Sequence, residues 1–259
     1  MAKIITVWGS PGSGKTMFCC TLAMEIAQRN KKVLLISADQ MIPMLPVLAP
    51  AQKAKKETSI STLFFANQIN KVFVANAIHI QKEYPLIGIM GYCADEIPTD
   101  ILWPGMQRIH NILELAGELV EYIIWDCTSN LENCMNTAMI AYADFVLRIL
   151  SPDLKGIQYY QNSQKLLQAE QYHFFEHITL AGMVRPYHAI EEMSYLVGKL
   201  DGILPFRKEM DRCAVEGDFF GAYGQCHEKY KEVLEEMADS IETLESNSSK
   251  KEGDTYDLP

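Results

Sequence analysis

The feature that most constrains this chain is a glycine-rich segment near its amino terminus. Residues 9–16 read Gly-Ser-Pro-Gly-Ser-Gly-Lys-Thr, the full G-x-x-x-x-G-K-[ST] pattern of a phosphate-binding loop. An apolar run, residues 4–8, precedes the loop, and a helical pattern follows it. In a strand, loop and helix of this kind, backbone N–H groups face a phosphate and the helix dipole attracts it. An ordinary glycine-rich turn into a helix is the alternative, and the complete pattern in this context disfavours it.

The loop assigns chemical roles to its residues. The Lys15 ammonium should reach the β and γ phosphates of a nucleoside triphosphate, and the Thr16 hydroxyl should ligate Mg²⁺. The residues expected to surround the phosphates are Gly12, Ser13, Gly14, Lys15, Thr16 and Met17.

Composition narrows the class of protein. The chain has 259 residues, of which 48% are hydrophobic and 22% charged, so it can bury a large globular core. Its formal net charge of −10 provides no general attraction for nucleic acid, and direct DNA binding is not expected. The sequence shows no signal peptide and no apolar run long enough to span a bilayer. Seven cysteines without a C-x-x-C pair are typical of reduced thiols, which predicts a cytoplasmic protein.

Apolar runs alternate with helical stretches along most of the chain. This rhythm predicts a three-layer α/β/α P-loop fold with a mainly parallel sheet buried on both faces. Helices are expected near residues 15–28 and 104–121. Residues 41–50 contain three prolines, so we expect an apolar loop there rather than a regular helix or a central strand. This loop could pack over the sheet end, face a partner or sense the bound nucleotide. The strands are expected near residues 3–8, 33–38, 86–91, 121–126, 145–150 and 178–184.

The carboxyl-terminal part changes in character. Residues 1–225 are predicted to form the P-loop domain, residues 226–246 an acidic amphipathic helix, and residues 247–259 a disordered tail. The helix carries a narrow apolar seam, which favours docking on the domain over a coiled coil because two heptads are too few. The seam consists of Tyr230, Leu234, Met237, Ile241 and Leu244.

Asp126 is the candidate carboxylate for magnesium. It ends the apolar run of residues 122–125, so it should emerge at the carboxyl edge of the sheet, where it would hold Mg²⁺ through water. Capping a helix that starts near Asn130 is the alternative role, but Ser129 and Asn130 are closer to that helix.

Asp39 is a second candidate carboxylate. It follows the apolar run of residues 33–37 and should lie at the same edge of the sheet. It could orient the attacking water or bind magnesium through water. It could equally form a turn before the proline-rich loop, and the sequence does not decide between these roles.

The order of these elements resembles the ParA/MinD family of P-loop ATPases. The resemblance covers roughly residues 3–220 and implies that ATP and Mg²⁺ are bound, that two ATP-bound subunits dimerise face to face, and that hydrolysis separates them. By resemblance, Lys15, Asp39 and Asp126 are the catalytic residues, Thr16 and Asp126 the magnesium-side residues, and the backbone around Pro205 and Phe206 borders the adenine. The segments that carry the resemblance are the loop and residues 32–39, 122–126, 143–147, 151–153, 202–206 and 216–217.

Three departures from the family pattern bear on activity. Ser10 stands where most members have a signature lysine that reaches the partner's phosphates, which implies either slow hydrolysis or a dimer that forms without that contact. Ser37 replaces the family's first carboxylate after the second strand. Residues 183–186, Met-Val-Arg-Pro, lack the asparagine that reads the base; ATP is favoured over GTP only because a guanine-specific N-K-x-D is also absent.

The resulting hypothesis is an ATP-dependent homodimerisation switch that positions a partner complex of the pilus or secretion, plasmid or cell-division type. The pilus-localisation branch, TadZ/CpaE, is similar in tolerating unusual loops. A nucleotide-binding scaffold with negligible hydrolysis is an alternative. A P-loop kinase for a small molecule is another, disfavoured because residues 41–103 contain no arginine for the developing charge.

Two further motifs have plainer explanations. Residues 173–177 fit the H-x-x-E-H pattern of a zinc site, but histidines at the end of a helix before a strand are the preferred interpretation. The lysine cluster of residues 53–56 is interpreted as a solvated face.

Overall fold

The computed structural model describes residues 1–50 and 56–244, and the fold is built around one sheet of eight strands. The sheet is parallel except for β3, which pairs antiparallel with β4 at one edge. In spatial order the strands are β3 (His79–Ile80), β4 (Ile87–Gly91), β2 (Val33–Ser37), β5 (Tyr122–Asp126), β1 (Lys3–Gly9), β6 (Phe145–Leu150), β7 (Ile178–Val184) and β8 (Gly202–Pro205).

The central strands are covered on both faces. Every residue of β2, β4 and β5 is buried, as expected for parallel strands with helices on both sides. The six predicted strands are all present and the predicted fold class is confirmed. The sequence did not predict β3 and β8 as strands, because two and four residues are too few for a clear periodicity.

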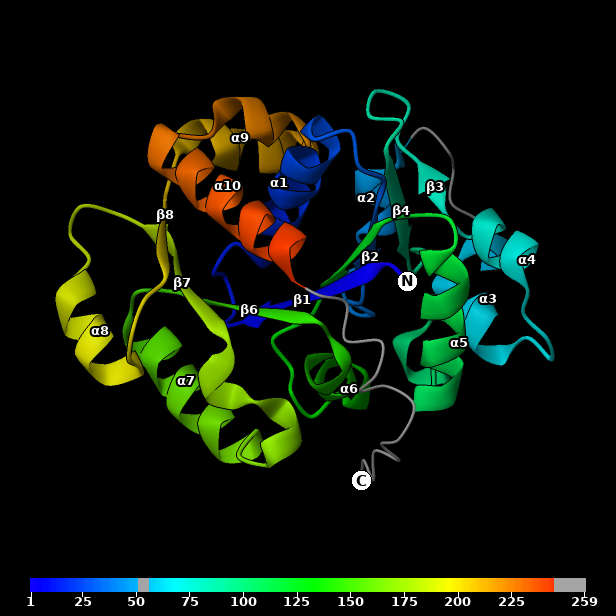
Figure 1. The fold of residues 1–259 in the computed structure, drawn as a ribbon, viewed down its shortest axis with the longest axis horizontal. Coiled ribbons are helices and arrows are strands. Elements are labelled where there is room, and N and C mark those ends of the chain that lie inside the picture. Colours follow the sequence, from blue (N-terminus) through cyan, green and yellow to red (C-terminus); the bar gives the residue numbers. More distant parts are fainter. Residues whose placement is uncertain (51–55, 245–259) are drawn as a thin grey trace.

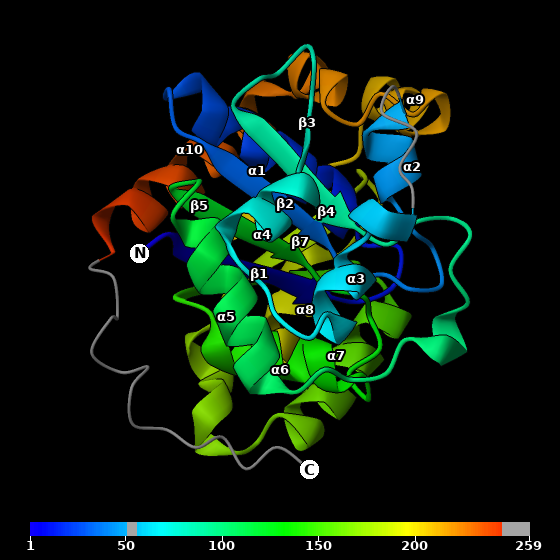
Figure 2. The same ribbon diagram turned by 90° about the vertical axis from the view of Figure 1, so that its right-hand side faces the viewer.

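The helices form the two outer layers. Helices α1, α9 and α10 lie on one side of the sheet, and α6 and α7 lie on the other (Figure 1). Helices α3 and α4 pack against α5 beside β4 (Figure 2). The helices are α1 (Lys15–Gln28), α2 (Leu45–Leu48), α3 (Ile60–Phe65), α4 (Lys71–Asn76), α5 (Met106–Gly117), α6 (Cys134–Tyr142), α7 (Leu154–Leu166), α8 (Ile190–Val197), α9 (Lys208–Glu216) and α10 (Glu228–Thr243).

Strand β1 shows how the sequence builds two cores. Successive side chains of a strand point to opposite faces. Ile5 and Val7 join the cluster that includes residues of α1 and α10, whereas Ile4 and Trp8 join the cluster beneath α5 and α6. The strand is therefore apolar on both faces at these four positions, and it holds the loop that follows it between two packed layers.

The prediction for residues 41–50 is partly wrong. The segment contains the short helix α2, whose Leu45 and Leu48 are buried. Pro46 lies in its first turn, where a missing N–H breaks no helical hydrogen bond. Met41 and Ile42, before α2, are 78% and 63% exposed.

Other predicted segments differ in detail. The helix expected over residues 104–121 is α5, which begins after Gly105 and ends at Gly117. Residues 173–177 form tight 3-10 turns rather than the last turn of a helix. The predicted tail, residues 247–259, and most of the lysine cluster lie outside the described residues. Helix α10 packs against α1 and β8 and buries Tyr230, Leu234, Met237 and Ile241 of its seam.

Candidate functional site

The loop after β1 is held against the ends of two neighbouring strands. Gly9 has a φ of +145°, and a Cβ there would lie 1.8 Å from the Ile149 carbonyl oxygen of β6. A Cβ on Gly182 of β7 would lie 2.1 Å from the Ser13 carbonyl oxygen. Only glycine fits either position, so these residues let the loop pack directly on the backbone of the sheet.

Helix α1 begins at the end of this loop. Its N-cap is Gly14, in the left-handed conformation at φ 87°, and in the described structure no side chain caps the helix. The N–H groups of its first turn are therefore available to an anion, which the helix dipole also favours.

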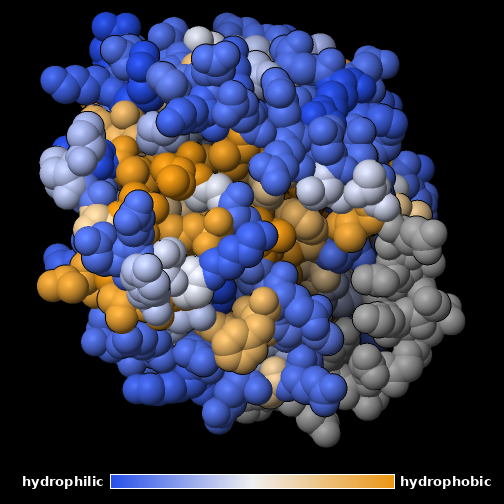
Figure 3. Space-filling model, turned by 60° about the vertical axis from the view of Figure 1, so that its left-hand side comes forward, coloured by the Kyte–Doolittle hydropathy of each residue, from blue (hydrophilic) through white to orange (hydrophobic). Residues whose placement is uncertain are grey.

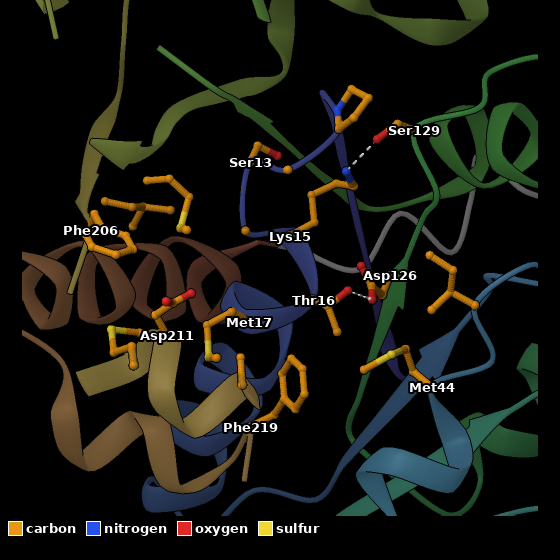
Figure 4. A pocket seen from close by; sticks show the side chains of 18 of the residues that line it. Ser13, Lys15, Thr16, Met17, Met44, Asp126, Ser129, Phe206, Asp211 and Phe219 are labelled. Carbon is orange, nitrogen blue, oxygen red and sulfur yellow. Dashed lines mark hydrogen bonds between the residues drawn. The ribbon is translucent and has the colours of Figure 1, made fainter. Parts of the chain in front are cut away.

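Lys15 is held in place by oxygen acceptors at the site. Its Nζ donates to the carbonyl oxygens of Gly9 and Ser10, at 3.2 and 2.9 Å, and to Ser129 Oγ at 2.7 Å (Figure 4). Burial lowers the pKa of Lys15, while Asp126 acts in the opposite direction. A phosphate would supply the negative charge that a buried ammonium lacks here.

Thr16 and Asp126 form the second polar pair. Thr16 Oγ1 donates to Asp126 Oδ2 at 2.7 Å (Figure 4). The other oxygen, Asp126 Oδ1, is buried and accepts no hydrogen bond from the described residues. Burial raises the pKa of Asp126 to about 6. A hydroxyl beside a carboxylate with an unused oxygen suits a hard cation such as Mg²⁺ or one of its bound waters.

Ser10 and Ser37, the two serines that depart from the family pattern, have different environments. Ser10 Oγ accepts a hydrogen bond from Ser151 N at 2.8 Å and lies 3.1 Å from Ser151 Oγ, so it ties the loop to the end of β6. Ser37 pairs with Asp126 in the register of β2 and β5. Its buried hydroxyl makes no hydrogen bond within the described chain.

Asp39 has the turn-forming contacts that the sequence allowed. Its Oδ1 accepts from the backbone N–H groups of Met41 and Ile42, at 2.9 and 2.8 Å. The same residue lines the cavity together with Asp126. The turn contact is present, and a role toward water or magnesium stays a proposal.

These residues surround one cavity of about 530 Å³. The structure brings every predicted site residue to its lining: Gly12, Ser13, Gly14, Lys15, Thr16, Met17, Asp39, Asp126, Pro205 and Phe206. Sequence reasoning missed several other residues of the lining, namely Met44, Ser129, Met183, Met210, Asp211 and Phe219.

Ser129 shows why some of them were missed. It was interpreted as a helix cap, but α6 begins later, at Cys134, and its cap is Asn133. Ser129 instead accepts a hydrogen bond from Lys15. The sequence signal that could have identified Ser129 is its position three residues after Asp126, the carboxylate that ends β5.

The cavity has a polar and an apolar end. Lys15, Thr16 and Asp126 lie together at the polar end (Figure 4). Phe206 and Met17 lie toward the side formed by α9, together with Phe219 (Figure 4). This division matches the two parts of a nucleotide, a charged polyphosphate and a flat base.

The structure also bears on a zinc site and on a membrane-spanning helix. The described residues contain no group of three or more His, Cys, Asp or Glu side chains that could hold a metal ion, and His177 of the H-x-x-E-H segment is buried. Among the helices described, none combines the length and apolar character that crossing a bilayer requires.

Comparison with known proteins places this site in a family. The chain matches the model of the AAA domain family over residues 2–174, about two thirds of its length. A search of curated proteins gives no significant match.

Solved structures share the fold at low sequence identity. A ParA family ATPase from Chlorobium tepidum TLS has a TM-score of 0.74 at 14% identity, covering 94% of this chain and 99% of that chain. The MinC:MinD cell division protein complex from Aquifex aeolicus gives 0.72 at 16%, covering 93% and 96%. The septum site-determining protein MinD from Pyrococcus horikoshii OT3, complexed with Mg-ADP, gives 0.70 at 14%, covering 94% and 97%. These matches confirm the predicted three-layer fold and its resemblance to the fold of the ParA and MinD proteins.

Proposed function

We propose, from the premise that this chain belongs to the AAA domain family, that it is a nucleotide-dependent switch. It binds ATP with Mg²⁺ in the cavity beside Lys15 and hydrolyses ATP slowly. Its nucleotide state controls homodimerisation and the binding of a protein partner. The observation that carries the proposal is the pairing of Lys15 and Thr16 with Ser129 and Asp126 at the polar end of the cavity.

The residues at the polar end support binding and positioning of the triphosphate. Lys15 would exchange its three oxygen acceptors for the β and γ phosphates, whose charge offsets its burial. The first-turn N–H groups of α1 would bind the adjacent phosphate oxygens. Asp39 and Asp126 both line the cavity, and Asp39 would orient the attacking water.

Magnesium fits the same end of the cavity. Thr16 Oγ1 and Asp126 would hold the ion, Asp126 through water, and its unused Oδ1 supports this assignment. When bound, the ion neutralises negative charge on the phosphate oxygens. The solved MinD structure with Mg-ADP supports this assignment by analogy of fold.

The surface around the cavity supports association with another protein. Figure 3 turns the left-hand side of Figure 1, which carries the loop after β1, toward the viewer, and hydrophobic side chains form a band across that face. Exposed apolar residues next to the site include Ile42, which lines the cavity, and Leu154 at the start of α7. Such a patch on a soluble fold is typical of an interaction surface. We propose a second copy of this chain as its ATP-dependent partner.

The cellular partner and location follow by analogy. The solved MinC:MinD complex supports a protein partner for a chain of this fold. Pilus or secretion, plasmid and cell-division complexes remain the proposed classes, in the cytoplasm. The acidic net charge of −10 disfavours DNA as the direct partner.

A scaffold with negligible hydrolysis is the second candidate function, and two observations favour it. Ser10, at the position of the signature lysine, is occupied by its hydrogen bonds with Ser151. Ser37 provides a hydroxyl rather than a carboxylate beside Asp126. A scaffold predicts tight ATP binding with almost no phosphate release. The kinase alternative lacks support, since the one arginine in the cavity lining, Arg207, lies next to Phe206 at the apolar end.

Light scattering and phosphate release test these functions together. The unmutated protein should double its mass on addition of Mg-ATP, and Lys15→Ala should abolish the change because the phosphates lose their main charged contact. An unchanged mass with and without Mg-ATP contradicts the switch. Phosphate release at the level of buffer alone, with ATP bound, selects the scaffold.

A further inference from the structure

The apolar end of the cavity contains one acidic side chain. Asp39, Asp126 and Asp211 are the carboxylates of the lining. Asp126 lies at the phosphate end with Thr16, whereas Asp211 extends from α9 into the cavity between Phe206 and Met17 (Figure 4). Within residues 1–50 and 56–244, its carboxylate forms neither a hydrogen bond nor an ion pair.

The surroundings of Asp211 suit a flat heterocycle. Phe206 is kept in position by Arg185, whose guanidinium carbon lies 3.9 Å from the ring centroid, and by its own backbone bond to Val184 at 2.8 Å. Met17, Met210 and Phe219 add apolar side chains to the lining of the same cavity, and Asp211 itself is exposed to solvent. Stacking on such side chains gives a base affinity but no discrimination between bases.

A carboxylate in this slot can discriminate between purines. An ionised Asp only accepts hydrogen bonds. At the six-position adenine presents an amino donor, and guanine presents a carbonyl acceptor. The segment at the end of β7, Met-Val-Arg-Pro at residues 183–186, supplies no side-chain amide for this task.

We infer that Asp211 is the base-selecting residue of this chain and accepts a hydrogen bond from the six-amino group of adenine. The inference rests on the proposed nucleotide-binding function. Guanine in the same orientation would place its O6 against the carboxylate, and two acceptors facing each other without a proton are repulsive.

Equilibrium binding of ATP, GTP, dATP and purine riboside triphosphate, which lacks the six-amino group, tests the inference. The unmutated protein should bind ATP roughly tenfold more tightly than GTP or purine riboside triphosphate, the value of one hydrogen bond to a charged group. Asp211→Ala should bring these three affinities within about twofold of one another. Asp211→Asn should improve GTP binding, since an amide can also donate to O6.

Glu216→Ala is the matched control, because Glu216 is an exposed acid of the same helix that pairs with Arg212 and lies outside the cavity lining. It should leave the ATP to GTP ratio unchanged. A ratio that is the same in Asp211→Ala and the unmutated protein overturns the inference and leaves the proposed function intact. A preference for GTP that Asp211→Ala removes also overturns it, as does a selective loss of discrimination between ATP and dATP, which would assign Asp211 to the ribose. If none of the four nucleotides binds, the proposed function itself is contradicted.

Discussion

Strand β1 joins two regions that both bury a positive charge. At its end the loop places Lys15 in the nucleotide cavity. Trp8, the residue before the end of β1, helps to enclose Arg148, which is 3% exposed. We call the group around this side chain the arginine cluster; it consists of Trp8, Arg148, Tyr160, Phe174 and His177. Trp8 and Arg148 are direct neighbours in the register of β1 and β6.

The guanidinium of the arginine cluster is enclosed by aromatic rings and has two oxygen acceptors, while its buried Nε has no hydrogen-bond partner among the described residues. The guanidinium carbon lies 4.7 and 4.5 Å from the ring centroids of Tyr160 and Phe174. Its nitrogens donate to the Phe174 carbonyl and to Thr179 Oγ1, at 3.3 and 2.7 Å. Burial lowers the pKa of Arg148 to about 10, so the side chain stays charged near neutral pH.

The difference between the two regions is access. Lys15 and Asp126 line a cavity in which a ligand can replace their present contacts. Arg148 is packed against aromatic rings, and none of the cluster's residues belongs to the cavity lining. A buried charge is therefore not a mark of a binding site by itself. Buried polar atoms without a hydrogen bond occur in both regions, for example Asp126 Oδ1 and Arg148 Nε in the described structure, so the open space beside Lys15 and Asp126 is what makes the cavity a candidate site.

The largest effect is expected at Lys15, where a substitution should weaken ATP binding strongly and change stability little. Lys15→Ala should weaken ATP binding by about 4 kcal/mol, roughly 1,000-fold, since at least two charge-assisted contacts to phosphate are lost. The free energy of unfolding should change by less than about 0.5 kcal/mol, because burial of the ammonium already opposes folding, as its lowered pKa shows. Calorimetry and urea unfolding measure the two quantities. Lys199→Ala, at a lysine whose side chain is 85% exposed, is the control, and a strong loss of stability with ATP affinity retained would contradict the distinction.

The opposite result is expected at Arg148. Arg148→Ala should lower the free energy of unfolding by about 3 kcal/mol, because it leaves a hole among aromatic rings. Arg148→Met should cost less, since it fills much of the same volume without a buried charge. Both variants should retain ATP affinity within about twofold. A parallel fall in ATP affinity would show that the cluster acts on the cavity through Trp8, and the comparison would then fail.

The sequence revealed these regions unequally. The loop and the carboxylate at the end of β5 lie in short local patterns, so the phosphate end of the cavity could be predicted residue by residue. Asp211 lies on α9 and Phe219 just after it, and both reach the cavity because the chain from α9 through the turn at residues 221–225 folds back to α1; no local pattern reports that contact. Arg148 interrupts the apolar run of β6, and its aromatic enclosure comes from α7 and the turn at Phe174, elements that are distant in sequence. Helix α2 was missed because prolines were taken to exclude a helix, although a first-turn proline is compatible with one.

A pH titration sharpens the comparison at His177. Burial, with the nearby Arg148 charge, lowers the pKa of His177 from its ordinary 6.5 to about 3. Between these values the unfolded chain binds a proton that the folded chain does not, so stability falls as pH decreases from 7 to 5. The contribution of His177 to that fall should be about 1–2 kcal/mol. Urea unfolding of His177→Phe should show a smaller decrease over the same pH range, and an identical decrease would mean that His177 is protonated in the folded protein.

The smallest effect on stability is expected at Ser10. This residue belongs to the loop, but its side chain contacts Ser151 at the end of β6 and does not line the cavity. Its hydroxyl accepts from Ser151 N at 2.8 Å, so Ser10→Ala should cost about 1 kcal/mol of stability by leaving that N–H without its partner. ATP affinity should stay within about twofold. Ser151→Ala keeps the backbone donor and loses the two hydroxyl contacts with Ser10 and with the exposed Asp153 carboxylate, each at 3.1 Å, so it leaves no buried N–H without a partner and should cost less. If Ser10→Ala instead lowers ATP affinity tenfold with stability unchanged, Ser10 belongs to the cavity. Hydrogen bonding to the end of β6 would then not explain why this loop functions without a lysine at that position.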